Sequence, residues 1–402
     1  MYKYTIYILC LIFNVANSQE LVQFSMGPGY QVDIYYSLNN GITGYPERTN
    51  WDLAFSTGYN PNIRINSGNG ITLFKVSNNT ENWSSITSMP SDAMQLRNSN
   101  LNWQEGAFTV NEYGDIDTNW LEYNDSFNPI LQSGSYIYII NYGQASKKLK
   151  INSFLEGTFN LTIANLDGSG EQNININTLN YTDKKFIYYS LANNELIDRE
   201  PMSSNWDIVF TKYEEKDVFL NGDTMFYVVT GALVNSNQVA EYNGPIDVNP
   251  DYSALNISND INTIGYDWKE YNNGFTIVPN KAYYIYNQYQ TSIYKINFQS
   301  FEGQVSGNTS FNIEELEYNS KQEELDNDPN INIYPNPTND NIVINNINHS
   351  TKINIISNKG NLVYEKTHNQ SCKINTAIFP KGIYFINLAN TNFNINKKVV
   401  FN

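Results

Sequence analysis

The chain has 402 residues and a formal net charge of -16, and only 16% of its residues are charged. The tail from residue 331 carries seven lysines and two acids, so the preceding residues hold a net charge of -21. This acidity excludes a nucleic-acid-binding body, because nucleic-acid affinity depends on neutralising phosphates. The 31 tyrosines, 20 phenylalanines and 6 tryptophans, with asparagine and glycine for turns, are typical of β-structure.

Residues 1–18 have the layout of a secretory signal peptide. A lysine precedes an apolar stretch over residues 6–13, and Ala16-Asn17-Ser18 supplies small side chains before cleavage at Gln19. A lipoprotein signal at Cys10 is the weaker alternative, because no small residue stands at the neighbouring position. No other stretch reaches the roughly 18 to 20 apolar residues that cross a bilayer. We therefore predict export without a transmembrane anchor.

The residues between the signal peptide and the tail contain one pattern twice. NWLEYN at 119–124 matches DWKEYN at 267–272, an offset of 148 residues, and the register continues ungapped to Tyr136–Tyr138 against Tyr284–Tyr286. Further matches are Tyr35–Leu38 with Tyr188–Leu191, Asn50–Phe55 with Asn205–Phe210, Lys150–Asn152 with Lys295–Asn297, and Glu156-Gly157 with Glu302-Gly303. Such self-similarity indicates a tandem duplication.

Apolar residues alternate with other residues in both copies, and no long stretch has a sustained 3.6-residue period. We therefore predict an all-β protein, with two tandem antiparallel β-rich modules followed by a small immunoglobulin-like β-sandwich. The predicted boundaries are a first module at 19–170, a second module at 178–318, an acidic linker at 319–330 and a tail domain at 331–402. The modules contain no cysteine, so hydrophobic cores must stabilise them.

A Trp-Asp-(Leu/Ile)-x-Phe pattern, a later aromatic strand and a Lys-Ile-Asn strand that ends in Glu-Gly occur in both modules. This combination resembles the HmuY family of secreted haem-binding proteins. The resemblance implies HmuY-like β modules and haem held by paired histidine or methionine side chains. Both histidines, His349 and His368, lie in the tail, so Met89, Met94 and Met225 remain as candidate haem ligands. The alternative for these methionines is a place in the core, which is their commoner role.

Catalytic chemistry has few candidates in the modules. Without an imidazole or a thiol they offer neither a nucleophilic triad nor an ordinary zinc site. Asp167–Glu171 lacks the full spacing of a calcium loop and is interpreted as a turn. Acids that recur in register could serve a glycosidase, which needs two carboxyl groups, but solvated strand ends explain them better. These acids are Glu122 with Glu270 and Glu156 with Glu302.

Two pairs of tryptophans also recur. Trp51 pairs with Trp206, and Trp120 pairs with Trp268. Aromatic faces can stack on sugars, but equivalent positions in both copies favour core anchors, because large aromatic side chains dominate burial. We predict no catalytic residue and no metal site.

The last 72 residues contain four short motifs in a fixed order. They begin with Tyr334-Pro335-Asn336-Pro337, place Gly360 in a hairpin, place Gly382 and Tyr384 at a strand, and end with Lys397 and Lys398. The segment resembles the type A C-terminal sorting domain of the type IX secretion system. The resemblance implies transport across the outer membrane of a Bacteroidetes-type bacterium, with the tail cleaved or anchored to surface lipopolysaccharide.

The sequence thus predicts a protein that passes through the periplasm and is secreted or held at the outer-membrane surface. We expect a non-enzymatic binding protein, with haem or a similar hydrophobic ligand implied by the HmuY resemblance. The alternative is a surface adhesion or glycan-binding protein that uses the same fold as a scaffold. The expected partners are the type IX secretion machinery and surface lipopolysaccharide, and no nucleic acid.

Overall fold

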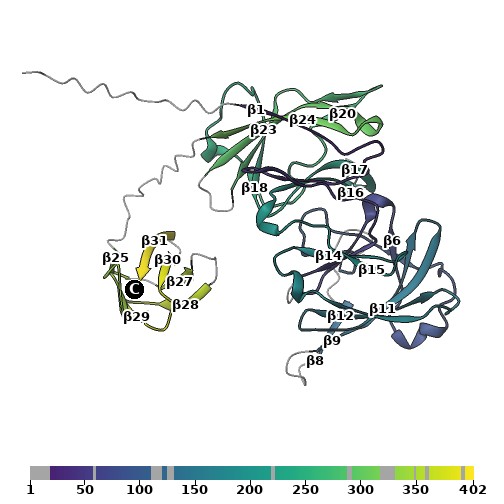
Figure 1. Cartoon of the computed structure of the whole chain (residues 1–402), viewed down its shortest axis with the longest axis horizontal. Coiled ribbons are helices and arrows are strands. Elements are labelled where there is room, and N and C mark those ends of the chain that lie inside the picture. Colours follow the sequence, from purple (N-terminus) through teal and green to yellow (C-terminus); the bar gives the residue numbers. More distant parts are fainter. Residues whose placement is uncertain are drawn as a thin grey trace, which may run out of the picture. The chain divides into compact units, whose positions relative to one another are not determined.

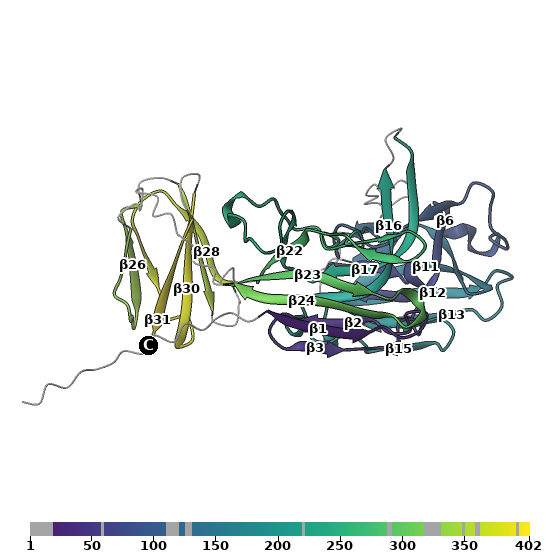
Figure 2. The same cartoon turned by 90° about the horizontal axis from the view of Figure 1, so that it is seen from above.

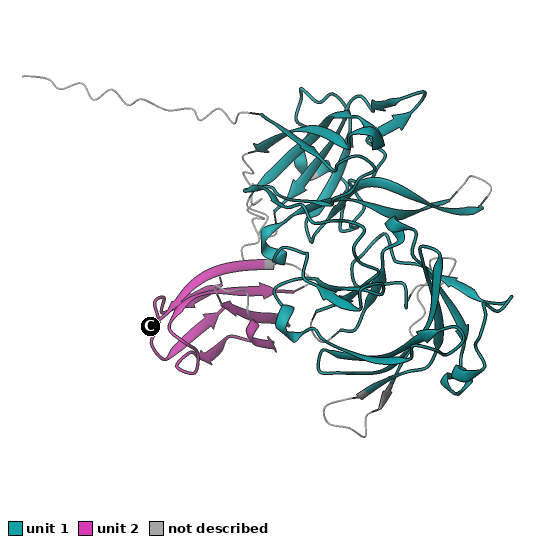
Figure 3. Cartoon of the chain, turned by 45° about the vertical axis from the view of Figure 1, so that its right-hand side comes forward, with its two compact units in different colours: residues 1–318 teal, residues 319–402 magenta. Residues whose placement is uncertain are grey.

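A computed structural model describes residues 19–57, 60–109, 120–124, 131–218, 222–287, 292–316, 331–347, 350–357, 362–390 and 394–402. The predicted signal peptide, the linker at 319–330 and Gly360 lie outside these ranges. The chain forms two compact units, unit 1 at residues 1–318 and unit 2 at residues 319–402 (Figure 3). Within the described ranges no helix is long and apolar enough to cross a membrane.

Antiparallel strands dominate both units, which confirms the prediction of an all-β fold. Among the described residues, the short 3₁₀ turns are η1 (Ser67–Asn69), η2 (Thr80–Ser84), η4 (Leu179–Tyr181), η5 (Ser203–Asn205), η6 (Tyr252–Ala254) and η7 (Gly303–Val305).

Unit 1 contains two large outer sheets and two four-stranded inner sheets. The first outer sheet has the order β13 (Gln172–Asn177), β12 (Thr158–Asn165), β11 (Ala145–Leu155), β10 (Ile137–Tyr142), β6 (Thr72–Ser77), β7 (Met94–Leu96), and β9 (Leu131–Gly134) joins β11 to β8 (Leu121–Asn124). The first inner sheet is β15 (Glu195–Ile197), β14 (Phe186–Ser190), β4 (Leu53–Ser56), β5 (Ile63–Ile65). The second inner sheet is β3 (Gly41–Gly44), β2 (Ile34–Ser37), β16 (Ile208–Val218), β17 (Thr224–Val234). The second outer sheet is β1 (Glu20–Ser25), β24 (Asn308–Leu316), β23 (Ile293–Phe301), β22 (Lys281–Tyr286), β18 (Gln238–Asn243), β19 (Ile257–Ser258), with β20 (Lys269–Tyr271) and β21 (Phe275–Ile277) as a separate pair.

Each outer sheet packs on one inner sheet, so unit 1 consists of two sandwiches, here called the first and second half. The core of the first half joins Phe55 of the inner sheet to Tyr138 of the outer sheet, and the core of the second half joins Phe210 to Tyr283. Figure 1 shows the four layers one above the other, with the two inner sheets facing each other in the middle. The region between the two inner sheets is here called the junction. There Trp103 of the first half packs against Trp206 of the second, with their ring centroids 6.1 Å apart.

The two halves have the same strand order but do not follow the chain. The first half is the continuous stretch from β4 to β15, whereas the second half takes β16 to β24 and is completed by β1 to β3 from the N-terminal end. Accordingly, β1 pairs with β24 and β2 pairs with β16. The predicted modules follow the sequence repeat, whereas the strand pairs assign residues 20–44 to the second half.

Each half thus contains a Tyr-Tyr-Ser-Leu strand from the other sequence repeat, β2 in the second half and β14 in the first, and we call this arrangement the strand exchange. Two equivalent aspartates hold these strands by hydrogen bonds. The carboxylate of Asp207 accepts a hydrogen bond from the backbone N–H of Leu38 at 2.8 Å. In the first half, the carboxylate of Asp52 accepts from the N–H of Leu191 at 2.6 Å. The repeated Trp-Asp pattern therefore positions a carboxylate at the end of each Tyr-Tyr-Ser-Leu strand, and each strand enters the sandwich of that aspartate.

One detail of the predicted repeat is wrong. The ungapped register equates Tyr138 with Tyr286, but Tyr138 belongs to the core of the first half and Tyr286 to a cluster on the opposite face of its sheet. Successive side chains in a strand point to opposite faces of the sheet. The predicted offset of 148 residues is even and pairs Tyr138 with a residue on the wrong face, so the true offset in this strand must be odd. Tyr283 and Ile285 are the core-facing residues of β22.

The second inner sheet also carries an extension that the first lacks. β16 and β17 have 11 residues each, whereas β4 has 4 and β5 has 3. Figure 2 shows this hairpin projecting beyond its sheet. Near its base, Arg97 of the first half forms an ion pair with Glu214, so the extension ties the halves together.

Unit 2 is a small β-sandwich, as predicted for the tail. One sheet has the order β25 (Asn332–Tyr334), β26 (Asn341–Asn345), β29 (Cys372–Asn375), and the other has β28 (Leu362–His368), β27 (Thr351–Ser357), β30 (Gly382–Ala389), β31 (Asn394–Phe401). Both sheets contribute to one core, which includes Ile344 from the first and Ile355 and Leu388 from the second. Alternating isoleucines thus produce the two buried faces.

Candidate functional site

The junction between the two inner sheets encloses a cavity of about 80 Å³, here called the junction pocket. Aromatic side chains supply much of its wall. The lining includes Trp51, Trp103 and Tyr188 from the first half and Tyr35 from the second. The ring centroids of Trp51 and Tyr188 are 4.9 Å apart in an edge-to-face arrangement. Trp51 and Trp103 are half-buried.

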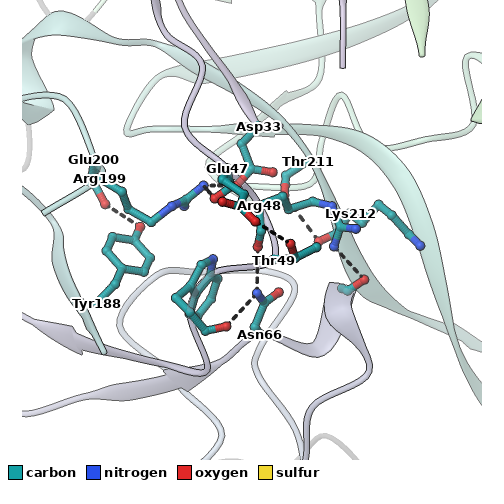
Figure 4. A network of polar contacts seen from close by, with 12 residues as sticks. Asp33, Glu47, Arg48, Thr49, Asn66, Tyr188, Arg199, Glu200, Thr211 and Lys212 are labelled. Atoms are coloured by element: carbon teal, nitrogen blue, oxygen red, sulfur yellow. Dashed lines mark hydrogen bonds and ion pairs between the residues drawn. The ribbon is translucent and has the colours of Figure 1, made fainter. Parts of the chain in front are cut away.

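A buried ion pair crosses the junction at this pocket. The guanidinium Nη2 of Arg199, after β15, lies 2.6 Å from Oδ2 of Asp33, before β2, and both side chains are at most 4% exposed. The same Nη2 donates to the carbonyl of Glu47 at 3.1 Å. Figure 4 shows the guanidinium directed at Asp33. The strand exchange brings these residues together, since Asp33 enters the second half with β2 and Arg199 leaves the first half after β15.

Four of the described residues that line the pocket each have a buried polar atom without a hydrogen-bond partner. These atoms are Oδ1 of Asp33, Nε of Arg199, Nε1 of Trp51 and the hydroxyl oxygen of Tyr213. An unpaired buried polar atom costs about 1 to 3 kcal/mol, so most such atoms in proteins have a partner. An acceptor, two donors and a hydroxyl group on the lining residues of one cavity are therefore the expected features of a place where a polar molecule binds.

Glu200 lies behind the pocket wall in a second polar cluster. Its carboxyl oxygens accept a hydrogen bond from the Tyr188 hydroxyl at 2.8 Å (Figure 4) and another from the backbone N–H of Lys185, also at 2.8 Å. Burial raises the pKa of Glu200 to about 7, against the lowering effect of both hydrogen bonds and of the Lys185 and Arg199 charges. Glu200 thus orients the Tyr188 ring, which lines the pocket.

Arg48 holds the opposite side of the junction. Its Nε donates to the carbonyl of Tyr30 at 2.7 Å and its Nη1 donates to the carbonyl of Gly68 at 3.0 Å. Gly68 must be glycine, because a Cβ there would lie 2.0 Å from the carbonyl oxygen of Lys212 on β16. Burial lowers the pKa of Arg48, and the Arg199 charge lowers it further, while Asp33 opposes the change. Arg48 therefore links the backbones of the two halves.

The ion pair at the pocket is not a product of the duplication. In the register that equates Tyr35 with Tyr188, Asp33 corresponds to Phe186 and Arg199 corresponds to Pro46. The fold thus tolerates uncharged residues at the equivalent places of the other half. This asymmetry favours a role for the pair beyond holding the fold together.

Arginine is the signal in the sequence that points to this junction. The chain has four arginines against 20 lysines: Arg48, Arg64, Arg97 and Arg199. Arg48, Arg97 and Arg199 each bond across the two halves. Arg64 lines the pocket and lies over the Trp103 ring at 5.2 Å. Our sequence analysis missed these residues because they follow no repeat and no motif.

The three methionines proposed as haem ligands have different surroundings. Met89 is 38% exposed in the loop before β7, and Met225 is 47% exposed on β17 of the other half. Met94 is half-buried against the core of the first half. None of the three lines the junction pocket, so the structure adds no support to haem ligation.

The other predicted residues have identifiable surroundings. Trp120, Trp206 and Trp268 are buried, which confirms them as core anchors, whereas Trp51 is half-buried at the pocket. Glu122 and Glu270 are exposed on strands. Glu302 accepts hydrogen bonds from Ser306 and Asn308, and these bonds lower its pKa. Glu156 occupies a turn with a φ of 44°. The side chain of Asp167 caps a turn by accepting from Ser169, as predicted.

The described residues of the predicted sorting motif form one structure in unit 2. Asn336 accepts a hydrogen bond from the N–H of Val400 and donates to the carbonyl of Lys398, both at 2.9 Å. The buried Tyr384, two residues after Gly382, donates to the carbonyl of Pro380 at 2.7 Å. Tyr334, Pro335, Pro337, Lys397 and Lys398 are exposed. The start of the tail is therefore bound to its last strand, with the lysines free to face a partner.

Comparison with known proteins identifies the tail. The family model described as "Secretion system C-terminal sorting domain" matches residues 332–402. No curated protein matches the chain. Among solved structures, the chain is similar to PorZ, a surface component of the type IX secretion system of Porphyromonas gingivalis. The identity is 10% and the TM-score is 0.17, over 72% of this chain and 45% of that chain.

The sorting domain establishes how the protein leaves the cell. A tail of this family marks cargo of the type IX secretion system, so the chain is exported to the cell surface or the extracellular space. This confirms the export route predicted from the tail motifs.

Proposed function

We propose that the chain is a non-enzymatic binding protein that holds a small ligand in the junction pocket. The observation that carries the proposal is the set of unpartnered atoms on Asp33, Arg199 and Trp51 at one aromatic-walled cavity. Pockets of this kind, apolar with a few convergent polar groups, are the usual form of ligand sites in proteins.

The lining of the pocket supports binding over catalysis. Asp33 is the single carboxylate among the described residues that line the pocket, and it is paired with Arg199. Hydrolysis of a glycosidic bond uses two carboxyl groups, one on each side of the bond. The lining also contains no histidine or cysteine to act as a base or a nucleophile.

Titration of the full exported chain with three kinds of small molecule tests the proposal. The set comprises neutral sugars (glucose, galactose, mannose, N-acetylglucosamine), zwitterions (glycine, alanine) and anions (acetate, succinate), and tryptophan fluorescence reports binding. We expect one class to bind in a 1:1 ratio and to bind less well to Trp51→Phe. Absence of binding by every class, or binding that Trp51→Phe leaves unchanged, would contradict the proposed site.

Haem capture stays a prediction from the HmuY resemblance. A Soret shift on adding haemin, lost in a variant without Met89 and Met94, would support it, and an unchanged Soret band would remove haem from the account. Attachment of the tail to lipopolysaccharide is likewise a prediction, which the mass of the surface-bound chain tests.

A further inference from the structure

We propose that the junction pocket takes the hydroxyl-bearing edge of a neutral sugar residue, an inference that rests on the proposed function. Adjacent hydroxyl groups of a sugar both donate and accept hydrogen bonds, and the carbon framework between them has apolar faces. The pocket offers groups that match each of these properties.

The unpartnered atoms match a pair of hydroxyl groups. Oδ1 of Asp33 can only accept, whereas Nε of Arg199 and Nε1 of Trp51 can only donate. A hydroxyl that donates to Asp33 can accept from one of the two donors, and its neighbour can accept from the other. Hydrogen bonds to the charged groups are the stronger ones, since an ionised partner roughly doubles the strength.

The charge balance favours a neutral ligand. Asp33 and Arg199 already neutralise each other at 2.6 Å, and their side chains are 4% and 3% exposed. A carboxylate or an ammonium ion entering alone would add an uncompensated charge to this buried place, which is costly. A sugar adds none, so it can use the charged atoms without disturbing the ion pair.

The size and walls of the pocket limit how much of the sugar enters. A volume of about 80 Å³ is several times the roughly 10 to 15 Å³ that a cavity needs to hold one water molecule, so the pocket has room for a group the size of a few water molecules. The half-buried Trp51 and Trp103 line the pocket and can pack against the apolar face of the remainder. The ligand is therefore a terminal or protruding sugar residue rather than an enclosed chain.

The test compares glucose, galactose, mannose and N-acetylglucosamine with glycine and acetate, by calorimetric titration of the full exported chain. We expect at least one neutral sugar to bind and glycine and acetate not to bind. Trp51→Phe keeps an aromatic ring and removes one donor, so its Kd for the sugar should rise roughly fivefold to tenfold. Trp83→Phe is the matched control, because the Trp83 indole donates to Glu171 at 2.7 Å and does not line the pocket.

The outcomes separate this inference from the proposed function. If glycine or acetate binds, no sugar binds, and Trp51→Phe weakens the binding, the sugar inference is wrong but the pocket remains a small-molecule site. If Trp51→Phe and Trp83→Phe bind the sugar equally well, the sugar does not bind in the junction pocket. If no probe binds, the unpartnered atoms serve buried water only, and both proposals fail.

Discussion

Deletion of residues 19–49 should unfold the second half of unit 1 and leave the first half folded, although these residues precede the first half in the chain. The deletion removes β1, which pairs with β24, β2, which pairs with β16, and β3, which pairs with β2. The buried core of the second half loses six side chains: Phe24, Met26, Tyr30, Ile34, Tyr36 and Leu38. At about 1.5 to 3 kcal/mol each, the loss is roughly 9 to 18 kcal/mol, which matches or exceeds the usual 5 to 15 kcal/mol stability of a folded domain.

Hydrogen exchange measured by mass spectrometry on the deletion variant gives the answer strand by strand. Peptides from β16 to β24 should exchange at the rate of an unfolded chain, and peptides from β4 to β15 should stay protected. Two point variants provide a matched pair, because Tyr36 and Tyr189 occupy equivalent core positions in the two halves. Tyr36→Ala should loosen the second half and Tyr189→Ala the first, each by about 3 to 5 kcal/mol. Protection of the second half together with loss of the first after deletion would refute the strand exchange.

Four further predictions concern the junction, the aspartates Asp52 and Asp207, and the tail. Because burial raises the pKa of Glu200 from its ordinary 4.5 to about 7, this group favours the fold at low pH and the effect is lost as pH rises from 4.5 through 7. Glu200→Gln should remove about 3 kcal/mol of the stability difference between pH 4.5 and 8 in urea titrations, and an unchanged difference contradicts the prediction. Asp33→Asn should cost about 3 to 5 kcal/mol in the same assay, because it leaves Arg199 buried without its counter-charge, while Asp33→Leu with Arg199→Met should recover most of the loss; equal losses in both variants would show that the ion pair is not the cause. Asp207→Ala should speed hydrogen exchange at the Leu38 amide, and Asp52→Ala should do so at the Leu191 amide. If either variant instead speeds exchange at the amide in the opposite half, these hydrogen bonds do not hold the strands. Deletion of residues 331–402 should leave the chain in the periplasm, as fractionation and surface proteolysis report, and undiminished surface delivery would contradict its role as the sorting signal.

The fold class, the duplication and the tail were predictable because each rests on a local pattern. Alternating apolar residues predict strands wherever they occur, and the motifs of the tail lie close together in the chain. The register of β22 was not predictable, because Tyr283 to Tyr286 are buried on both faces and the alternation that reveals a face is absent.

The strand exchange was hidden by the similarity of the repeats. Tyr35–Leu38 and Tyr188–Leu191 have nearly the same sequence, so either strand suits either sandwich, and composition cannot tell which one it enters. The pocket follows from that choice. Asp33 and Arg199 are 166 residues apart, and only the fold reveals that they meet; the small number of arginines is the one trace they leave in the sequence.

Fluorine NMR of the exported chain labelled with 5-fluorotryptophan tests the central claim, ligand binding at the junction pocket, most directly. The six tryptophans give six signals, which single Trp→Phe variants assign. Addition of a neutral sugar should shift the signals of Trp51 and Trp103, which line the pocket, and leave those of Trp83 and Trp120 unchanged. If no signal moves at saturating sugar, or if Trp83 shifts while Trp51 does not, the junction pocket is not the binding site.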